Sequence, residues 1–417
     1  GAIYNGASLS LQDVTIRNSG TSDTGSDTAY GGAVYTIAGG NLKAQNCAFT
    51  SNSVPTWRAY GGAIYFSGAV KTSGTIWSGG ALTVDHCTFT GNRVAGWGGG
   101  GGSVPAYGGA IYTTGSNGVV TITNSSFTGN SVSAYGYGGA IYNDGSYLVS
   151  VSDTSFTSNS ADNGGALYGG FALLRVTMTG NSASSCGGAW CGSGSMIDST
   201  VANNSAYYVG GIYSTGNLTL LDSTISGNTA TGSSGYGGGV YNWGYQLKVY
   251  QCTLSGNRAT GSSSGYGGAI YNASGGTLTL VQSTVTQNQA SQGGGVYNGG
   301  TAMVQNSIIA GNTATVSGQD VRGAFQTTSA YNVIGIVNDS TGLGDDPHTR
   351  AGTTVAPLAV PMTGLGYNGG LTPTHVLIGA ANPAVDAGST ALAVNAYGQA
   401  LTADQRETGY PRLVGGS

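Results

Sequence analysis

A six-residue motif, Tyr-Gly-Gly-Ala-Ile-Tyr, recurs along the chain and constrains the fold more than any other feature. Full copies stand at residues 60–65, 107–112, 137–142 and 266–271, with looser copies between them. A second motif, Phe-x-x-Asn, alternates with the first at residues 49–52, 89–92, 127–130 and 156–159. Two motifs that alternate with a period of about 22 to 30 residues indicate a solenoid, in which each repeat forms one coil.

The shortest spacing between the motifs gives the size of one coil. The steps from Asn159 to Tyr168 and from Tyr168 to Asn181 are 9 and 13 residues, so the minimal unit is 22 residues. That length is too short for a helix pair and fits one coil of a parallel β-helix. Residues 218–220 and 278–281 have the pattern of short strands with one buried face. We therefore predict an all-β, single-stranded parallel β-helix, right-handed because parallel connections strongly favour that hand.

Regular repeats extend over residues 1–312, and each contains an apolar position followed by Asn. Stacked coils should turn the apolar position into a continuous core ladder. The Asn is expected to take the left-handed conformation at a turn, with its amide paired to the Asn amides above and below. The Asn ladder consists of Asn52, Asn92, Asn130, Asn159, Asn181, Asn204, Asn228, Asn257, Asn288 and Asn312. Residues 313–417 should form irregular rungs that continue the solenoid and cap it.

Insertions beyond the minimal repeat are confined to particular places in the coil, and one set ends in Tyr just before the Gly pair. Insertions on one side usually mark the variable and often functional face of a solenoid. One interpretation is an aromatic surface that binds glycans or a partner; the other is that each Tyr packs on its neighbour and shields the Gly turn. The candidate face comprises Trp57, Tyr60, Trp97, Tyr107, Tyr137, Tyr236 and Tyr266.

Charge and acid spacing argue against several functional classes. The net charge is -4 and only 7% of residues are charged, so there is no basic footprint for nucleic acid. The sequence has no run of about 20 apolar residues, so it does not predict a segment that inserts into a membrane. No cofactor, metal or catalytic residue is predicted. Asp198 and Asp222 are expected in adjacent rungs as solvated groups, and residues 345–350 form either a cation site or a solvated turn. A cleft with three or more converging carboxylates would instead favour a polysaccharide-active enzyme.

The chain has five cysteines, and their spacing is not that of a zinc site. Cys47 and Cys87 occupy the same position in neighbouring rungs, where stacked Cα atoms about 4.8 Å apart permit either a disulfide or a ladder of buried thiols. Cys186 and Cys191 flank a Gly-Gly turn and could bridge locally.

The two repeated motifs resemble the passenger repeat of chlamydial polymorphic outer-membrane proteins and related bacterial surface β-helices. The C-terminal part is similar to that of bacterial choice-of-anchor Q surface proteins, through residues 368–375, residues 383–388 and the Asp404-x-Arg406 pair. The family pattern has Gly where this chain has Glu407. The resemblance implies a secreted or cell-surface protein, often an adhesin.

The chain begins inside a repeat and stops short of the family's closing segment, so both ends are expected to be open. Open β-helix ends present unpaired backbone groups, and head-to-tail contact through them would build a filament. The sequence therefore favours a non-enzymatic extracellular structural protein that forms homo-oligomers end to end. The alternatives are an adhesin that uses the Tyr/Trp loops and, less favoured, a polysaccharide-active enzyme.

Overall fold

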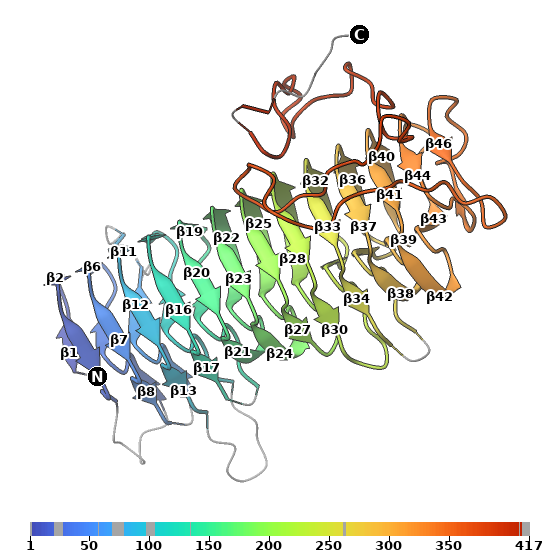
Figure 1. The fold of residues 1–417 in the computed structure, drawn as a ribbon. Coiled ribbons are helices and arrows are strands. Elements are labelled where there is room, and N and C mark those ends of the chain that lie inside the picture. Colours follow the sequence, from blue (N-terminus) through green and yellow to red (C-terminus); the bar gives the residue numbers. More distant parts are fainter. Residues whose placement is uncertain are drawn as a thin grey trace. The chain divides into compact units, whose positions relative to one another are not determined.

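The computed structural model describes residues 2–20, 28–56, 58–68, 79–96, 105–133, 135–261, 264–407 and 409–410. The chain divides into two compact units, an N-terminal unit of residues 1–194 and a C-terminal unit of residues 195–417. In these described ranges all regular structure is β, and the strands pair in parallel from one coil to the next (Figure 1). The prediction of a parallel β-helix is confirmed. The described residues contain no apolar helix long enough to cross a bilayer.

In the N-terminal unit each coil contributes strands to three sheets, which we call A, B and C. The first column of sheet A contains β1 (Ile3–Asn5), β5 (Val34–Thr36), β10 (Ile64–Ser67), β14 (Ile111–Thr114), β18 (Ile141–Asn143) and β22 (Leu167–Leu174). The second column contains β2 (Ser8–Gln12), β6 (Asn41–Gln45), β11 (Ala81–Asp85), β15 (Val119–Thr123) and β19 (Val149–Ser152), and it ends on β22. Sheet B contains β3 (Thr15–Arg17), β7 (Ala48–Thr50), β12 (Thr88–Thr90), β16 (Ser126–Thr128), β20 (Ser155–Thr157) and β23 (Thr177–Thr179). Sheet C contains β8 (Ser53–Val54), β13 (Arg93–Val94), β17 (Ser131–Val132), β21 (Ser160–Asn163) and β24 (Ser182–Cys186), and β4 (Thr28–Tyr30) pairs with β9 (Arg58–Tyr60).

The C-terminal unit repeats the same arrangement. Its sheet A begins with β28 (Ile212–Leu221), from which two columns start. The first column continues with β31 (Val240–Asn242), β35 (Ile270–Asn272), β39 (Val296–Asn298), β43 (Val321–Ala324) and β45 (Ser340–Thr341). The second column continues with β32 (Gln246–Tyr250), β36 (Thr277–Val281) and β40 (Thr301–Gln305). Sheet B contains β26 (Thr200–Ala202), β29 (Thr224–Ser226), β33 (Thr253–Ser255), β37 (Thr284–Thr286), β41 (Ile308–Ala310), β44 (Val333–Ile334) and β46 (Arg350–Ala351). Sheet C contains β27 (Ser205–Ala206), β30 (Thr229–Ala230), β34 (Arg258–Ala259), β38 (Gln289–Gln292) and β42 (Thr313–Ser317). Strand β25 (Trp190–Ile197) runs through the residues where the two units meet in sequence.

The central residue of each sheet B strand fills the core, but the two units fill it differently. In the N-terminal unit the middle of this ladder, between Ile16 and Met178, is a stack of phenylalanine rings. Phe49, Phe89, Phe127 and Phe156 have neighbouring ring centroids 4.8, 4.6 and 4.9 Å apart. In the C-terminal unit the ladder is aliphatic. It consists of Val201, Ile225, Leu254, Val285 and Ile309, all completely buried. Both ladders remove apolar surface from water, which is the main favourable term in folding.

The Asn ladder lies inside the coil rather than at its surface. The backbone N–H and the Nδ2 of Asn130 both donate to the Oδ1 of Asn159 at 2.9 Å, and the same Nδ2 donates to the carbonyl of Phe89 at 2.9 Å. The pattern repeats in the C-terminal unit, where Asn257 bonds Asn288 in the same way. Each buried amide therefore satisfies backbone groups of the preceding coil and so joins two coils.

The expectation that these Asn residues take the left-handed conformation is wrong. The left-handed residue is the one before the Asn, as at Ser51 with φ 52°, Gly129 with φ 63° and Gly256 with φ 66°. The sharp turn at that residue directs the following Asn side chain inward. Burial and hydrogen bonding, not turn geometry, therefore explain the choice of Asn.

The Gly pair before each sheet A strand forms a turn that has no room for a side chain. Gly61 has φ +64°, and a Cβ on it would lie 2.1 Å from the carbonyl oxygen of Ile64. A Cβ on Gly62 would lie 2.0 Å from the carbonyl oxygen of Gly109 in the next coil. The repeated Gly-Gly is therefore required by close backbone approach within and between coils.

The final segment differs from the expected rungs. The coil persists to β46, and the chain then runs back along the outer surface of sheet B of its own unit (Figure 1). Thr224 Oγ1 donates to the carbonyl of Pro373 at 2.6 Å, and Thr253 Oγ1 donates to Gln405 Oε1 at 2.7 Å. This segment, residues 352–410, lacks the alternating apolar and Asn pattern that would fill another core rung.

Candidate functional site

In the N-terminal unit the tyrosines of the predicted aromatic face form one of two interlocked tyrosine stacks. Tyr60 and Tyr107 have ring centroids 5.3 Å apart, and Tyr107 and Tyr137 have centroids 5.6 Å apart, both pairs stacked. A second stack runs beside the first through the tyrosines that close the repeat motif. Tyr60 meets Tyr112 of this second stack at 4.9 Å, edge to face. The rings therefore use much of their surface on one another.

In the C-terminal unit the predicted tyrosines behave similarly. Tyr236 and Tyr266 stack with centroids 5.7 Å apart, and Tyr236 also stacks on Tyr271 at 5.7 Å. Trp57 and Trp97 lie outside the residues that the structure describes. The five described members of the predicted face are all half-buried, and each stacks on a tyrosine of a neighbouring coil.

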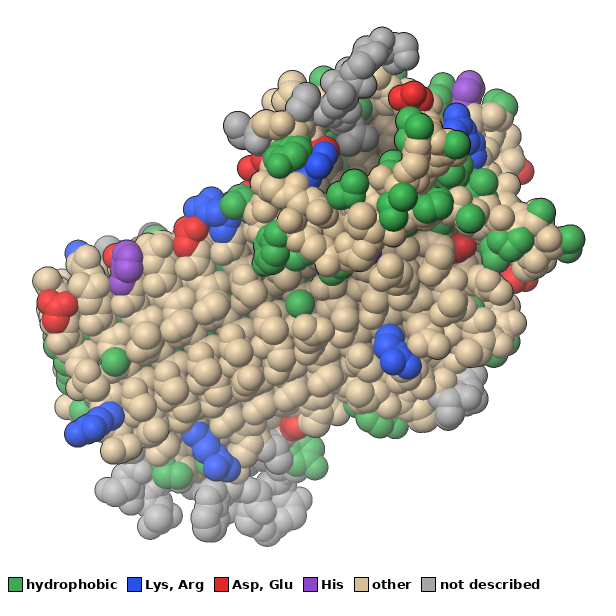
Figure 2. Space-filling view, viewed as in Figure 1, with side chains coloured by type: hydrophobic (Ala, Val, Ile, Leu, Met, Phe, Trp, Pro, Cys, Tyr) green, Lys and Arg blue, Asp and Glu red, His purple; other side chains and the backbone are tan. Residues whose placement is uncertain are grey.

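Other aromatic residues are far more exposed, and the search for Tyr before Gly pairs missed them. Trp243 is 58% exposed and lies edge-on to Tyr241 at 5.9 Å, while Tyr245 is 44% exposed. Trp243 follows the closing Tyr of its repeat by two positions, in the short loop between β31 and β32. A single Trp two positions after the closing Tyr was the one feature of the sequence that could have indicated this exposed aromatic site. The face in view in Figure 2 is dominated by uncharged side chains and backbone, with charged groups widely scattered.

The cysteines stand as free thiols. Cys47 and Cys87 lie in neighbouring coils, where the Cys47 backbone N–H points to the Cys87 Sγ at 3.4 Å, and burial raises the pKa of Cys87 to about 11. The Sγ atoms of Cys186 and Cys191 lie 3.7 Å apart, and this contact, together with burial, raises the pKa of Cys191. The two disulfide pairings stay predictions.

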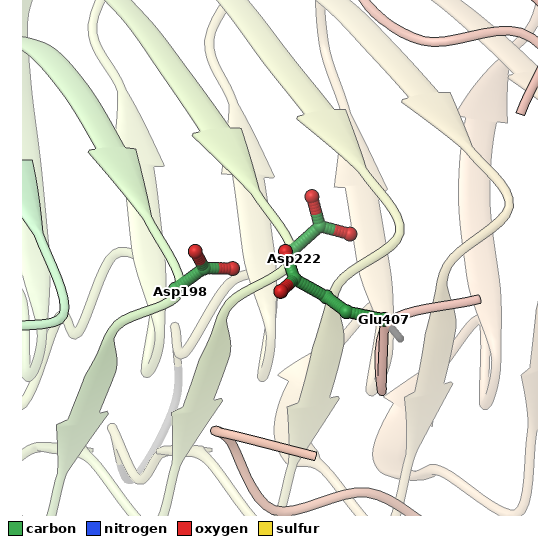
Figure 3. Close-up of side chains that lie close together, drawn as sticks. All are labelled: Asp198, Asp222 and Glu407. Atoms are coloured by element: carbon green, nitrogen blue, oxygen red, sulfur yellow. The ribbon is translucent and has the colours of Figure 1, made fainter. Parts of the chain in front are cut away.

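A cluster of acids that the sequence did not bring together lies in the C-terminal unit. Asp198 and Asp222 occupy the same corner of consecutive coils, between sheets A and B, with φ of 49° and 48°. Glu407 reaches them from the final segment, and one carboxylate oxygen from each of the three lies within 4.8 Å of the others (Figure 3). We call these three residues the acidic corner. Sequence reasoning placed Asp198 and Asp222 in adjacent rungs but treated them as solvated, and it could not place Glu407.

Burial and like charge shape the electrostatics of the acidic corner. Desolvation, and then the nearby Asp198 carboxylate, raise the pKa of Asp222 to about 7, against a hydrogen bond from Gln251. Glu407 and Asp404 add smaller effects in the same direction. Two or more carboxylates so close together resist simultaneous ionisation unless a proton or a cation intervenes.

A groove of about 450 Å³ separates the final segment from sheet B nearby. His375 crosses it, with its Nδ1 2.7 Å from the Thr363 carbonyl and its Nε2 2.9 Å from Ser255 Oγ. Both ring nitrogens are thus used in attachment, which favours a structural role for His375 over acid–base chemistry. The patch at residues 345–350 is built around Asp346, which accepts from the backbone N–H of Tyr331 at 2.9 Å and from Thr349 Oγ1 at 2.9 Å. These contacts indicate a turn stabilised by its own carboxylate.

One family model matches three short parts of the chain. Residues 124–144, 153–170 and 251–273 match the Chlamydia polymorphic membrane protein repeat. The matched segments span β16 to β18, β20 to β21 and β33 to β35, and thus include both motifs of the coil. These repeats are similar to those of a bacterial surface protein, which supports the predicted cell-surface location. No match emerged from comparison with curated proteins or with solved structures. The resemblance of the C-terminal part to choice-of-anchor Q proteins stays a prediction.

Proposed function

We propose that this chain is a non-enzymatic structural part of a bacterial surface protein, a parallel β-helix displayed outside the cell. The observation that carries the proposal is the coil-to-coil bonding by side chains, in which buried Asn amides and stacked rings join each coil to the next. Such ladders add rigidity along the stacking direction without forming a substrate cleft. The similarity to chlamydial membrane protein repeats supports the surface location.

The acidic corner is the feature that could support catalysis, and we assign it a different role. Glycoside hydrolysis needs two carboxylates that flank a bond of a bound sugar, typically about 5 to 9.5 Å apart. Here one of the three carboxylates belongs to the final segment, which lies against the coils that carry the other two. That arrangement suits attachment better than access by a polysaccharide.

We propose end-to-end self-association as the mode of assembly. Only 7% of residues are charged and the net charge is -4, so copies would meet little like-charge repulsion. Negative-stain electron microscopy of the purified chain over a range of concentrations tests this directly. Filaments with an axial repeat close to the length of one subunit are expected, and isolated short rods at every concentration would contradict self-association.

The non-enzymatic part has its own test. We expect no new reducing ends and no unsaturated products when the chain is incubated with a panel of acidic and neutral polysaccharides. Product formation that disappears in Asp222→Asn but persists in Asp153→Asn would overturn this part of the proposal. Asp153 occupies the same corner of a coil in the N-terminal unit, with φ 49°, and provides a matched control.

Glycan adhesion is the second candidate, and the exposure of Trp243 favours it. Sugar rings stack on open aromatic faces, which Trp243 offers and the stacked tyrosines offer less. On a glycan array, Trp243→Ala should abolish any signal and Tyr107→Phe should preserve it. The absence of glycan binding by the parent chain would remove this candidate.

A further inference from the structure

Two rows of outward side chains run along sheet B of the N-terminal unit, one on each side of the buried core ladder. The row that follows the core residue is made of threonines in register on consecutive coils, namely Thr50, Thr90, Thr128, Thr157 and Thr179. The row that precedes it contains Ala48, Thr88, Ser126, Ser155 and Thr177. We call these two rows the hydroxyl face, because every member except Ala48 carries a hydroxyl group.

The hydroxyl groups of this face are directed to solvent and are free to bind. Thr90, Thr128 and Thr157 are exposed, as are Thr88 and Thr177 in the other row. Among the residues that the structure describes, no side-chain hydroxyl of either row has a hydrogen-bond partner. A hydroxyl can both donate and accept, so each one can join a hydrogen-bonded layer outside the protein.

The spacing of the rows is fixed by the core beneath them. The rings of Phe49, Phe89, Phe127 and Phe156 stack directly below, with centroids 4.8, 4.6 and 4.9 Å apart, so the coils follow one another at a nearly constant distance. Threonine is β-branched and has a restricted χ1 angle, so its hydroxyl and methyl groups keep their places on a rigid strand. The hydroxyl face is therefore regular before any partner arrives.

Charged side chains border the hydroxyl face and do not enter it. Asp153 and Arg175 stand at the corner beside the row that begins with Ala48, and Arg17 occupies the position next to Thr50 in the preceding strand β3. Neither row has an Asp, Glu, Lys or Arg in the described strands β7, β12, β16, β20 and β23. The surface in view over the N-terminal unit in Figure 2 is correspondingly almost free of charged groups.

The coil itself does not require threonine at these positions. In the C-terminal unit the row that follows the core residue is Ala202, Ser226, Ser255, Thr286 and Ala310. Ser255 and Thr286 are only 3% exposed there. Threonine is thus repeated without interruption in the unit whose sheet B is open to solvent, which indicates a role outside the fold.

We propose that the hydroxyl face binds ice. One side chain repeated at one spacing matches a partner that is itself periodic, whereas the surface of a protein would present different groups to each coil. Successive coils lie about 4.8 Å apart and alternate residues of a strand about 6.6 Å apart. Oxygen atoms at the surface of ice repeat over comparable distances in two directions and carry no net charge, which suits a regular face without charged groups. Because the threonines are already ordered, binding costs little conformational entropy.

This inference goes beyond surface display, and slow growth of ice in a dilute solution of the unaltered full chain tests it. We expect the chain to be enriched in the ice fraction at least tenfold over serum albumin. Thr128→Tyr places a bulky ring in the middle of the hydroxyl face and should lower the enrichment at least tenfold. Thr313→Tyr, at an exposed threonine of β42 in the C-terminal unit, is the control and should keep the enrichment of the parent.

Circular dichroism first establishes that both variants melt like the parent chain. Exclusion of the unaltered chain from ice to the same extent as albumin would overturn the proposal without reference to any variant. Equal enrichment of Thr128→Tyr and the parent would also overturn it, because ice would then be bound elsewhere on the chain.

Sedimentation with crystalline cellulose distinguishes ice from another periodic partner. We expect no more of the chain to sediment with cellulose than of albumin. Sedimentation of the parent chain that is lost in Thr128→Tyr and kept in Thr313→Tyr would assign the hydroxyl face to a crystalline polysaccharide, and would overturn the assignment to ice.

Discussion

The two units build the same coil from the same positions, yet they differ in what covers sheet B. In the N-terminal unit the outward residues of β16 remain at the surface, and Thr128 is exposed. In the C-terminal unit the equivalent Thr253 and Ser255 of β33 are 2% and 3% exposed, because the final segment lies over them. Strands with nearly the same polar composition are thus solvent-facing in one unit and interior in the other. Hydroxyl side chains suit both places because they can bond either water or a docked backbone.

The core ladders of the two units differ in the opposite way, because different residues occupy the same environment. Phe127 and Leu254 occupy equivalent places in sheet B and are both completely buried, although one is aromatic and the other is aliphatic. The coil specifies an apolar residue at this position, and each unit then packs it with neighbours of the same kind. The predictions below are ordered from the largest expected effect to the smallest.

Loss of one ladder amide should be the most damaging change, and it should be equally damaging in both units. Asn130→Ala and Asn257→Ala each leave several buried backbone and amide groups without partners, so we expect a loss of about 3 to 5 kcal/mol in the free energy of unfolding. Urea unfolding, with hydrogen exchange to locate the damage, measures this. Asn117→Ala, at an exposed bend, is the control and should change stability by less than about 0.5 kcal/mol. Unequal effects in the two units would contradict the equivalence of their Asn ladders.

Exchange of the core residues tests whether the two packing solutions are specific to their units. Leu254→Phe inserts a ring among aliphatic neighbours and should cost about 1 to 3 kcal/mol through overpacking. Phe127→Leu removes a ring from the stack and should cost about as much. Thermal unfolding followed by circular dichroism compares the two variants with the parent chain. If both changes were neutral, the aromatic and aliphatic ladders would be interchangeable.

The docked segment should be removable without disturbing the N-terminal unit. Gln405 accepts from Thr253 Oγ1 at 2.7 Å and donates to Thr224 Oγ1 at 3.1 Å and Thr372 Oγ1 at 2.9 Å. Gln405→Ala should therefore cost about 1 to 3 kcal/mol and expose residues 352–407 to limited proteolysis. Mass spectrometry of the fragments identifies the cut sites. Thr128→Ala, on the uncovered strand, should leave the digestion pattern unchanged, and early cuts within residues 28–133 in Gln405→Ala would argue against a local effect.

The smallest effect concerns pH and belongs to the C-terminal unit. Its Asn ladder ends on Asp320, whose Oδ1 accepts from Asn312 Nδ2 at 2.8 Å and whose Oδ2 accepts from the Ile336 N–H at 2.8 Å. Burial raises the pKa of Asp320 despite these bonds. Because the folded protein then holds this proton more tightly than the unfolded chain, the contribution of Asp320 to stability is greatest below its ordinary pKa and is lost as pH rises through the folded value. The stability of Asp320→Asn relative to the parent should therefore improve with rising pH in denaturation at pH 3.5 and pH 8. A constant difference would show that Asp320 does not titrate abnormally.

Much of the fold could be predicted because the repeat itself encodes it. Spacing of the Phe-type, Asn and Tyr positions predicted the parallel coil, and in the structure Phe89 stacks on Phe127 and Tyr60 on Tyr107. The candidate site could not be predicted in the same way. Asp222 belongs to the repeat and its neighbour Asp198 was placed correctly in the adjacent coil, but Glu407 comes from a segment without periodicity.

The sequence by itself determined which residues stack, because contacts between successive coils follow directly from a fixed repeat length. Only the tertiary structure decided that the ladder Asn points inward behind a left-handed neighbour, since that depends on backbone angles that Asn and Gly can both adopt. Tertiary structure also decided that the final segment lies on sheet B and brings Glu407 to the acidic corner. Those contacts join residues far apart in the chain, and they are made by hydroxyl and carboxylate groups that would be equally stable when exposed to water.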